Sequence, residues 1–312
     1  MESGGDMVVE KALMKDELSK KNLFILFGAL IILLISGTVI FGLKVLLIAF
    51  VAYVAAWIVE FTFSRIRKKE MGLSVIITPL IFALMMPVTM DLWIVFVGSA
   101  FGVFFGKMIF GGQGKNIFNP ALVGILFVTV SFPVQMNTRW LNPETDIVAA
   151  VTPLISLNRG LPFDYSLMDL LLGNVPGVIG ETFRLGILIL GLLLIILKVI
   201  DFRITLSVLA TVFALTGTGY LLDPSSFVDP IMSMFVGGLL FGAFFVATDP
   251  VSAPMKSWGR VLYGVGIGIL TVIIRNFATF PEGITFSVVI MYAISPLIDS
   301  MLNKGGSHEL QS

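Results

Sequence analysis

Apolar segments of nearly membrane-spanning length recur along almost the whole chain, and they limit the possible folds more than any other feature. A hydrocarbon core of roughly 30 Å is crossed by a helix of about 20 apolar residues. Such segments lie at 23–41, 45–63, 73–89, 92–110, 118–133, 183–200, 204–222, 231–248, 261–278 and 285–301. Charged residues make up only 13% of the 312 residues and the mean hydropathy is +1.00. We therefore predict an all-α integral membrane protein with about ten transmembrane helices.

The spacing of these segments also predicts how the chain is divided. The stretch 166–180 is too short and too often broken by Gly and Pro to span, so we expect a re-entrant or interfacial segment. The mixed charges of residues 1–22 do not form a signal peptide. The expected parts are a cytoplasmic N-terminal segment (1–22), a first membrane repeat (23–133), an outer loop with the re-entrant segment (134–182), a second membrane repeat (183–301) and a cytoplasmic tail (302–312).

The positions of Lys and Arg predict the orientation, because both favour the cytoplasmic side. With ten spans and the N-terminus inside, 15 of the 20 basic residues fall on the inner side. The other five are Lys44, Arg139, Arg159, Arg184 and Arg275. We therefore expect both termini in the cytoplasm, the loop 134–164 outside, and the segments 111–121 and 248–254 at the inner side.

The reactive side chains are few, and this excludes several kinds of chemistry. There is no Cys, and the single His is His308, near the C-terminus. Cysteine-ligated iron–sulfur clusters, thiolate catalysis and histidine-based metal sites are therefore not expected. Electron transfer through this chain would need an organic cofactor. The net charge of zero offers no basic surplus for nucleic acid.

Acidic residues near the predicted spans offer no proton relay. Glu60 and Asp299 both lie close to predicted span ends, where an aqueous interface makes charge less costly. We therefore predict no buried chain of carboxylates in this subunit.

Interrupted hydrophobic segments recur in the two halves of the chain. In the first half, the helix in 79–90 is stopped at Pro87, and 111–124 begins the last helix after a Gly-rich turn; 239–254 and 280–291 repeat the pattern in the second half. Because five spans is an odd number, the second copy would be inverted relative to the first. Inverted repeats with broken helices place a ligand site near the pseudo-two-fold axis. The simpler alternative is that Gly and Pro are common in membrane helices.

Polar groups at the start of the predicted helix 118–133 have two interpretations. Asn116 and Asn119 either bind a ligand or cap this helix, because Asn is a good N-cap and Pro120 suits a first turn. Asp249 could equally cap the segment that begins at Pro250. The glycines at 111, 112 and 114 permit close approach of a ligand to the backbone, but the phosphate-loop pattern is absent.

Five motifs in order resemble one known family. They are GGQGKNIFNPALVG (111–124), FPVQM (132–136), DIVAAVTPL (146–154), GNVPGVIGET (173–182) and FFVATDPVSAP (244–254). They resemble the D subunit of the Rnf electron-transport complex and the related B subunit of the Na⁺-translocating NADH:quinone oxidoreductase. The resemblance implies a urea-transporter-like fold of ten helices in two inverted five-helix repeats. It also implies a multi-pass protein of the prokaryotic inner membrane, which carries electrons between ferredoxin and NAD⁺, coupled to Na⁺ or H⁺ transport.

The resemblance also implies two flavins. One is FMN attached by a phosphoester to a threonine, in a pattern like D-x-x-(S/T)-x-A-T, onto which Asp146 and Thr152 map. This chain departs from the pattern at Ala149 and Val151. The other is noncovalent riboflavin, for which the resemblance suggests the amides of Asn116 and Asn119. The remaining groups expected there are Gly112, Gly114 and the neighbouring rings of Phe110 and Phe118.

The implied partners are the other Rnf subunits: membrane iron–sulfur and flavin subunits, a soluble NADH/flavin subunit and a ferredoxin-like subunit. A flavin transferase is needed for maturation. Two alternatives remain open. One is a flavin-free scaffold subunit of the same complex, which the departures at Ala149 and Val151 favour. The other is a transporter or channel for a small neutral solute, which the repeat alone would equally explain.

Overall fold

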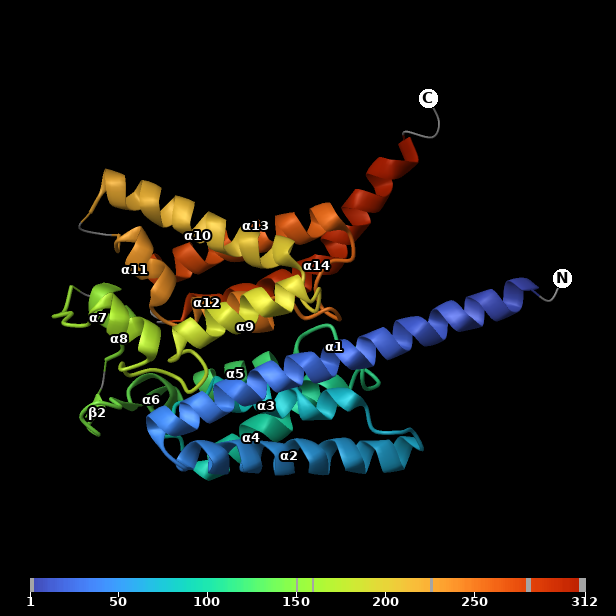
Figure 1. Ribbon diagram of the computed structural model, residues 1–312, viewed down its shortest axis with the longest axis horizontal. Helices are drawn as coiled ribbons and strands as arrows, with labels where there is room; N and C mark the ends of the chain where they lie inside the picture. The colour runs from blue at the N-terminus through green and yellow to red at the C-terminus, as the bar shows by residue number, and fades with distance from the viewer. Residues whose placement is uncertain (1–2, 150, 159, 225–226, 279–281, 309–312) are drawn as a thin grey trace.

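The helices of the two chain halves form two bundles joined by an irregular connecting segment (Figure 1). The computed structural model describes residues 3–149, 151–158, 160–224, 227–278 and 282–308, and side chains are described within 20–302. The connecting segment lies at one end of the molecule, and both chain termini lie at the opposite end (Figure 1).

The first bundle contains helices of very unequal length. Its elements are α1 (Ser3–Phe41), α2 (Lys44–Arg67), the 3₁₀-helix η1 (Leu73–Ile76), α3 (Thr78–Leu84), α4 (Leu92–Val103), the π-helix η2 (Phe104–Met108) and α5 (Pro120–Ser131). The helix α3 ends at Leu84, shortly before Pro87, which cannot donate a helical hydrogen bond. The helix α2 packs on α4, and α4 packs on α5.

The second bundle repeats this order of packing. Its elements are α9 (Arg184–Ile196), α10 (Phe202–Leu222), α11 (Pro230–Phe235), α12 (Leu239–Phe241), the π-helix η3 (Gly242–Val246), α13 (Ser257–Phe277) and α14 (Gly283–His308). The helix α10 packs on α13, and α13 packs on α14. Contacts of α1 with α9, and of α5 with α14, join the two bundles.

Helix length and composition identify a multi-pass membrane protein. Five helices among the described residues are long and apolar enough to cross a membrane: Lys20–Phe41 within α1, α2, α10, α13 and Gly283–Leu302 within α14. Four shorter apolar helical stretches lie between them: Leu73–Leu84, Leu92–Met108, Pro120–Ser131 and Arg184–Ile196. The expected segment 231–248 is broken into α11, α12 and η3. The all-α membrane class is therefore confirmed.

Glycines allow α4 and α5 to pack with their backbones in contact. A Cβ atom added at Gly102 would lie 2.5 Å from the Pro120 carbonyl oxygen and 2.9 Å from Gly124 Cα. Backbone atoms cannot move aside as a side chain can, so neither helix can accept a larger residue at this crossing.

Replacing Gly102 with Val is therefore expected to lower stability by about 1–3 kcal/mol, in the range of overpacked cores. Thermal melting of the purified protein checks this. The matched control is Gly28→Val, because a Cβ at Gly28 on α1 would meet no atom within 4 Å. Equal melting temperatures for the two variants would contradict the close α4–α5 packing.

The connecting segment contains the only described strands, a departure from the all-helical prediction. Its elements are α6 (Pro133–Asn137), β1 (Trp140–Leu141), β2 (Val148–Ala149), α7 (Pro153–Asn158) and α8 (Leu167–Leu172). The strands pair antiparallel, with Trp140 opposite Ala149. The helix α8 begins with a capping box of Ser166 and Asp169, whose hydrogen bonds lower the pKa of the Asp169 carboxyl.

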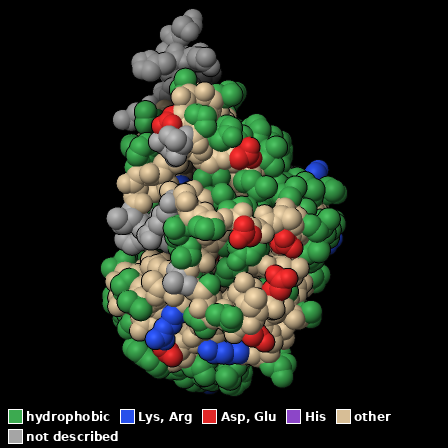
Figure 2. Space-filling view, turned by 90° about the vertical axis from the view of Figure 1, so that its left-hand side faces the viewer, with side chains coloured by type: hydrophobic (Ala, Val, Ile, Leu, Met, Phe, Trp, Pro, Cys, Tyr) green, Lys and Arg blue, Asp and Glu red, His purple; other side chains and the backbone are tan. Residues whose placement is uncertain are grey.

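Figure 2 shows the end of the molecule formed by this segment, where exposed acidic side chains outnumber basic ones. Glu144, Asp146 and Asp164 are exposed acids of the connecting segment, and Arg139 is an exposed cation there. Both Arg184 and Arg275, which the sequence places on this side, are buried. Few basic residues therefore reach solvent at this end.

Candidate functional sites

Thr152 is the N-cap of the short helix α7. Its Oγ1 accepts a hydrogen bond from the Ile155 N–H at 3.3 Å, and its carbonyl oxygen accepts one from the Ser156 N–H at 2.9 Å. Pro153 follows at the first helical position, where its missing N–H costs nothing. The side chain is only 7% exposed. Thr152 therefore stands at a helix start, and its hydroxyl already has a local hydrogen bond.

Asp146 lies at the turn of the hairpin that leads to Thr152. Its φ is 55°, in the left-handed region, which Asp tolerates better than most residues. Its N–H donates to the Asn142 carbonyl at 2.9 Å, and the Asn142 N–H donates to the Ile147 carbonyl at 2.9 Å. The exposed Asp146 carboxylate faces solvent, and Ala149 follows in strand β2. Residue 150 lies outside the described residues.

A cavity of about 350 Å³ lies at the N-terminal end of α5, away from the connecting segment. Three of the residues expected near riboflavin line it: Gly114, Asn116 and Asn119. Gly112, Phe110 and Phe118 are not among its lining residues. The aromatic side chain in its wall is Phe245, from η3 of the second bundle. The cavity therefore lies between the two halves of the chain.

The two asparagines of this cavity have different local roles. Asn119 is the N-cap of α5, because its Oδ1 accepts from the Ala121 N–H at 2.9 Å. Asn116 does not cap the helix: its Nδ2 donates to the Phe118 carbonyl at 3.1 Å and lies 3.5 Å from Ser252 Oγ. The Asn116 amide therefore connects the first-half loop with the 248–254 segment of the second half.

Charged groups from both halves of the chain line the same cavity. Lys107, from the π-helix η2, and Asp249, after η3, both line it. Lys107 Nζ lies 2.7 Å and 2.6 Å from the two carboxylate oxygens of Glu60, and both side chains are buried. Asp249 accepts from the Val251 N–H at 3.0 Å and caps no helix. The prediction that Glu60 lies at an aqueous interface is wrong, because the fold brings Lys107 to it as a buried partner.

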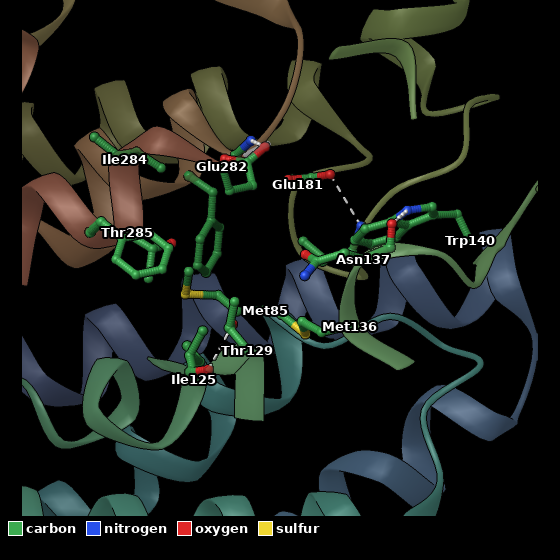
Figure 3. Close-up of a pocket in the computed structure, with 14 residues that line it drawn as sticks. Met85, Ile125, Thr129, Met136, Asn137, Trp140, Glu181, Glu282, Ile284 and Thr285 are labelled. Carbon is green, nitrogen blue, oxygen red and sulfur yellow. Dashed lines mark hydrogen bonds between the residues drawn. The ribbon is translucent and has the colours of Figure 1, made fainter. Parts of the chain in front are cut away.

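A second, smaller cavity of about 40 Å³ lies nearer the connecting segment (Figure 3), large enough for a few water molecules. Glu181 and Glu282 both line it, and their side chains lie close together at one edge (Figure 3). Glu181 accepts from the Val178 N–H at 3.1 Å, and Glu282 from the Gly238 N–H at 3.0 Å. A methyl group on Gly238 would lie 3.0 Å from Glu181 Oε2 and 3.4 Å from Glu282 Oε2. The two carboxylates therefore converge at a glycine.

Two buried arginines balance the charge of these carboxylates. Arg184 and Arg275 each interact electrostatically with both Glu181 and Glu282, and the two carboxylates also interact with each other. Arg184 Nη1 donates to the Leu170 carbonyl at 3.1 Å, in the last turn of α8. Arg275 Nη1 and Nη2 donate to the Ser233 and Val236 carbonyls at 2.9 and 3.0 Å, at the end of α11. Each arginine thus holds the C-terminal end of a short helix, where cations are favoured.

This pair of carboxylates, of which Glu181 is buried and Glu282 half-buried, was not anticipated from the sequence, in which only Glu60 and Asp299 were considered. One sequence signal for the cluster existed: Glu181 and Glu282 each end a Gly- and Pro-containing stretch directly before a predicted span, and ionisable groups at such positions are seldom accidental. Arg184 and Arg275 were also exceptions to the charge bias.

The structure does not bring all the predicted site residues together. Asn119 and Pro120 stand at the start of α5, whereas the connecting segment with Thr152 follows its end. The 12 residues of α5 span about 18 Å at 1.5 Å per residue. Thr152 and the cavity lined by Asn116 are therefore separate sites, toward opposite ends of α5.

Comparison with known proteins gives a consistent result. The model of the NQR2, RnfD, RnfE family matches residues 11–306. The chain is 32% identical over 302 residues to the D subunit of the ion-translocating oxidoreductase complex of Erwinia tasmaniensis, covering 83% of this chain and 85% of that one. It is 35% identical over 269 residues to the D subunit of the Na(+)-translocating ferredoxin:NAD(+) oxidoreductase complex of Acetobacterium woodii, covering 83% and 81%. It is 36% identical over 266 residues to the B subunit of the Na(+)-translocating NADH-quinone reductase of Ectopseudomonas mendocina, covering 80% of this chain but 64% of that one.

Proposed function

This chain belongs to the NQR2, RnfD, RnfE family, and we propose that it is the D-type membrane subunit of an ion-translocating ferredoxin:NAD⁺ oxidoreductase complex. The observation that carries the proposal is the match along 85% and 81% of the lengths of two D subunits of ion-translocating oxidoreductase complexes, the second of which is named for ferredoxin and NAD(+). The B-type reductase chain is covered to only 64%. The chain would carry electrons in a process coupled to Na⁺ or H⁺ transport, and would not be catalytic alone.

We further propose that FMN is attached to Thr152 through a phosphoester. A flavin bound there supplies a carrier of electrons that the chain's own side chains lack. The phosphoester is compatible with the hydrogen bond that Thr152 already makes. Esterification replaces the hydroxyl hydrogen, whereas the Ile155 N–H donates to a lone pair of the same oxygen, which the ester keeps. Because Thr152 is buried, the transferase would act before α7 docks. The extended backbone at Val148–Ala149 suits recognition of an unfolded segment.

We also propose that riboflavin, a flavin without a phosphate, binds in the cavity lined by Gly114, Asn116 and Asn119, here called the inner cavity. Its volume of about 350 Å³ lies within the range of small-molecule sites, roughly 300–1,000 Å³. Asn116 and Asn119 offer amide groups for a flavin edge, Phe245 offers an apolar wall, and Gly114 leaves room for the ring. The role of these groups is to bind and orient the flavin.

The repeat and its orientation are part of the same proposal. The packing order α2–α4–α5 recurs as α10–α13–α14, and the broken elements η1–α3 and α11–α12–η3 occupy matching places. This supports ten membrane segments in two inverted five-helix repeats, as in urea transporters. Both termini lie at the end opposite the connecting segment (Figure 1), which with the charge bias favours a cytoplasmic location for both.

The proposed partners are the remaining subunits of the complex, including a soluble NADH-oxidising subunit and a ferredoxin-like subunit. The chain itself offers no dinucleotide fingerprint, so donor and acceptor sites must lie on those subunits.

Peptide mass spectrometry of the purified complex tests the proposal. The expected result is an FMN phosphoryl increment on the 146–154 peptide, located at Thr152. An unmodified peptide in a complex that is otherwise active would instead favour a scaffold subunit. Solute flux through vesicles that hold the flavin-free subunit alone would favour a transporter.

Removing the Asn116 amide is expected to weaken riboflavin binding by roughly 2- to 10-fold, as for the loss of one hydrogen bond. Noncovalent flavin per mole of complex, after extraction, measures the effect. Asn276→Ala is the matched control, since that amide donates within α13 to the Val272 carbonyl and does not line the cavity. Equal riboflavin in both variants would contradict the placement of the flavin.

A further inference from the structure

A basic groove lies where α9 ends and α10 begins, at the end of the molecule that carries the termini. It has a volume of about 480 Å³, and its charged lining residues are Lys198, Asp201, Arg203 and Arg260. It adjoins the inner cavity, with which it shares Val199, Ile200, Thr248 and Pro250, but its charged residues do not line that cavity. Neither proposed flavin site uses these cations.

Two of the three cations of the groove, Arg203 and Arg260, are held in place by one carboxylate. Asp201 caps α10 by accepting from the Arg203 N–H at 2.8 Å, and it pairs with Arg203 Nη1 at 3.3 Å and with Arg260 Nη1. Arg260 Nε also donates to the Pro254 carbonyl at 3.0 Å. Lys198 is exposed and has a φ of 57° in the turn before α10. Three cations thus face the groove with one anion, which leaves an excess of positive charge.

Apolar side chains continue the groove along the outside of the bundle. Ile196 and Phe202 line it and are 74% and 49% exposed. The Arg203 guanidinium lies 5.2 Å from the centre of the Phe202 ring, so charged and apolar surfaces adjoin. Leu193 on α9 and Leu206 on α10 extend the exposed apolar surface away from the cations. A free anion would gain nothing from this surface, whereas a molecule with a charged head and hydrocarbon chains would contact all of it.

We propose that this groove binds an anionic phospholipid, with the phosphate between Lys198 and Arg203 and the acyl chains against α9 and α10. Lysine and arginine near an anionic membrane surface each contribute about 1 kcal/mol to lipid attraction, and basic pockets between membrane helices bind phosphate head groups. Arg260 is bound to Asp201 and to the Pro254 carbonyl, and through Asp201 it fixes the position of Arg203. The bound lipid would brace the α9–α10 turn against the 248–254 segment.

Lipid titration of the delipidated, purified complex tests the proposal. Phosphatidylglycerol binding is measured by native mass spectrometry for the wild type and for Lys198→Gln/Arg203→Gln. The double variant is expected to bind about 25-fold more weakly, from about 5-fold per cation. Lys68→Gln/Lys69→Gln is the matched control, because it removes two exposed cations at the end of α2. Melting temperatures and flavin content of the same samples show that the variants fold and carry their cofactors.

Several results would overturn the proposal. One is equal phosphatidylglycerol binding by the double variant and the wild type. Another is equal binding of phosphatidylcholine, which lacks net negative charge. Displacement of the lipid by inorganic phosphate at similar concentrations would show a site for a free anion. A groove covered by a partner subunit, with no lipid retained in the complex, would show a protein interface. Because flavin content is read separately, failure here leaves the proposed electron-transfer function unaffected.

Discussion

Replacing Arg184 by Met is expected to destabilise the protein by about 3–5 kcal/mol, because a buried carboxylate would lose its compensating charge. Arg184 is 1% exposed, and the Leu170 carbonyl at the end of α8 would also lose its hydrogen-bond donor. Methionine fills a similar volume, so the effect comes from charge more than from a cavity. Thermal melting of the purified complex measures it, and Arg139→Met, at an exposed position, should stay within about 0.5 kcal/mol of wild type.

Second substitutions show whether the loss is electrostatic. Adding Glu181→Gln to Arg184→Met removes one negative charge along with the positive one. The double variant should therefore recover most of the lost melting temperature. Adding Glu282→Gln should recover less, because Glu282 interacts mainly with Arg275. Equal recovery by both, or none by either, would mean that the four charges do not form two coupled pairs. The interaction energies come from the double-mutant cycle, since residues in one network are not additive.

Local patterns predicted the features that depend on neighbouring residues. The Asn119–Pro120 pair allowed a helix start as one of two interpretations because a cap needs only residues within one turn, and Asn119 does cap α5. The apolar segments likewise predicted the membrane class, since the length of a span is set by the bilayer. The short hairpin of β1 and β2 was missed because two-residue strands leave no periodic pattern.

Features that depend on distant residues were not predictable in the same way. Lys107 reaches Glu60 only because α2 packs on α4, and the sequence gives no sign of that pairing. Glu181 lies at the end of the connecting segment and Glu282 just before α14, and they converge because Gly238 leaves room between them. Asn116 was grouped with Asn119, but its loop places it against Ser252 of the second half. A single sequence predicts such groups as buried polar residues that need partners, without identifying the partners.

Any substitution of Thr152 by a residue without a hydroxyl should abolish covalent FMN attachment. Two such substitutions distinguish the loss of the flavin from the loss of the α7 cap. Thr152→Asn keeps an N-cap for α7 and is expected to melt like the wild type, whereas Thr152→Val also loses the cap, at a cost of about 1 kcal/mol. Both should lack the FMN increment on the 146–154 peptide, and ferredoxin-dependent NAD⁺ reduction by the complex should fall to background.

Thr152→Ser supplies the positive control, because it keeps both the cap and a hydroxyl group that can form the phosphoester. It should retain covalent flavin and electron transfer, at a level that depends on how the transferase accepts serine beside Val151. Covalent flavin in Thr152→Asn, or undiminished electron transfer without it, would show that Thr152 acts only as the cap of α7. Complete loss of covalent flavin in Thr152→Asn, with a normal melting temperature, would instead show that flavin attachment and helix capping are separate roles of Thr152. That variant keeps a capping side chain but has no hydroxyl oxygen to bond the phosphate.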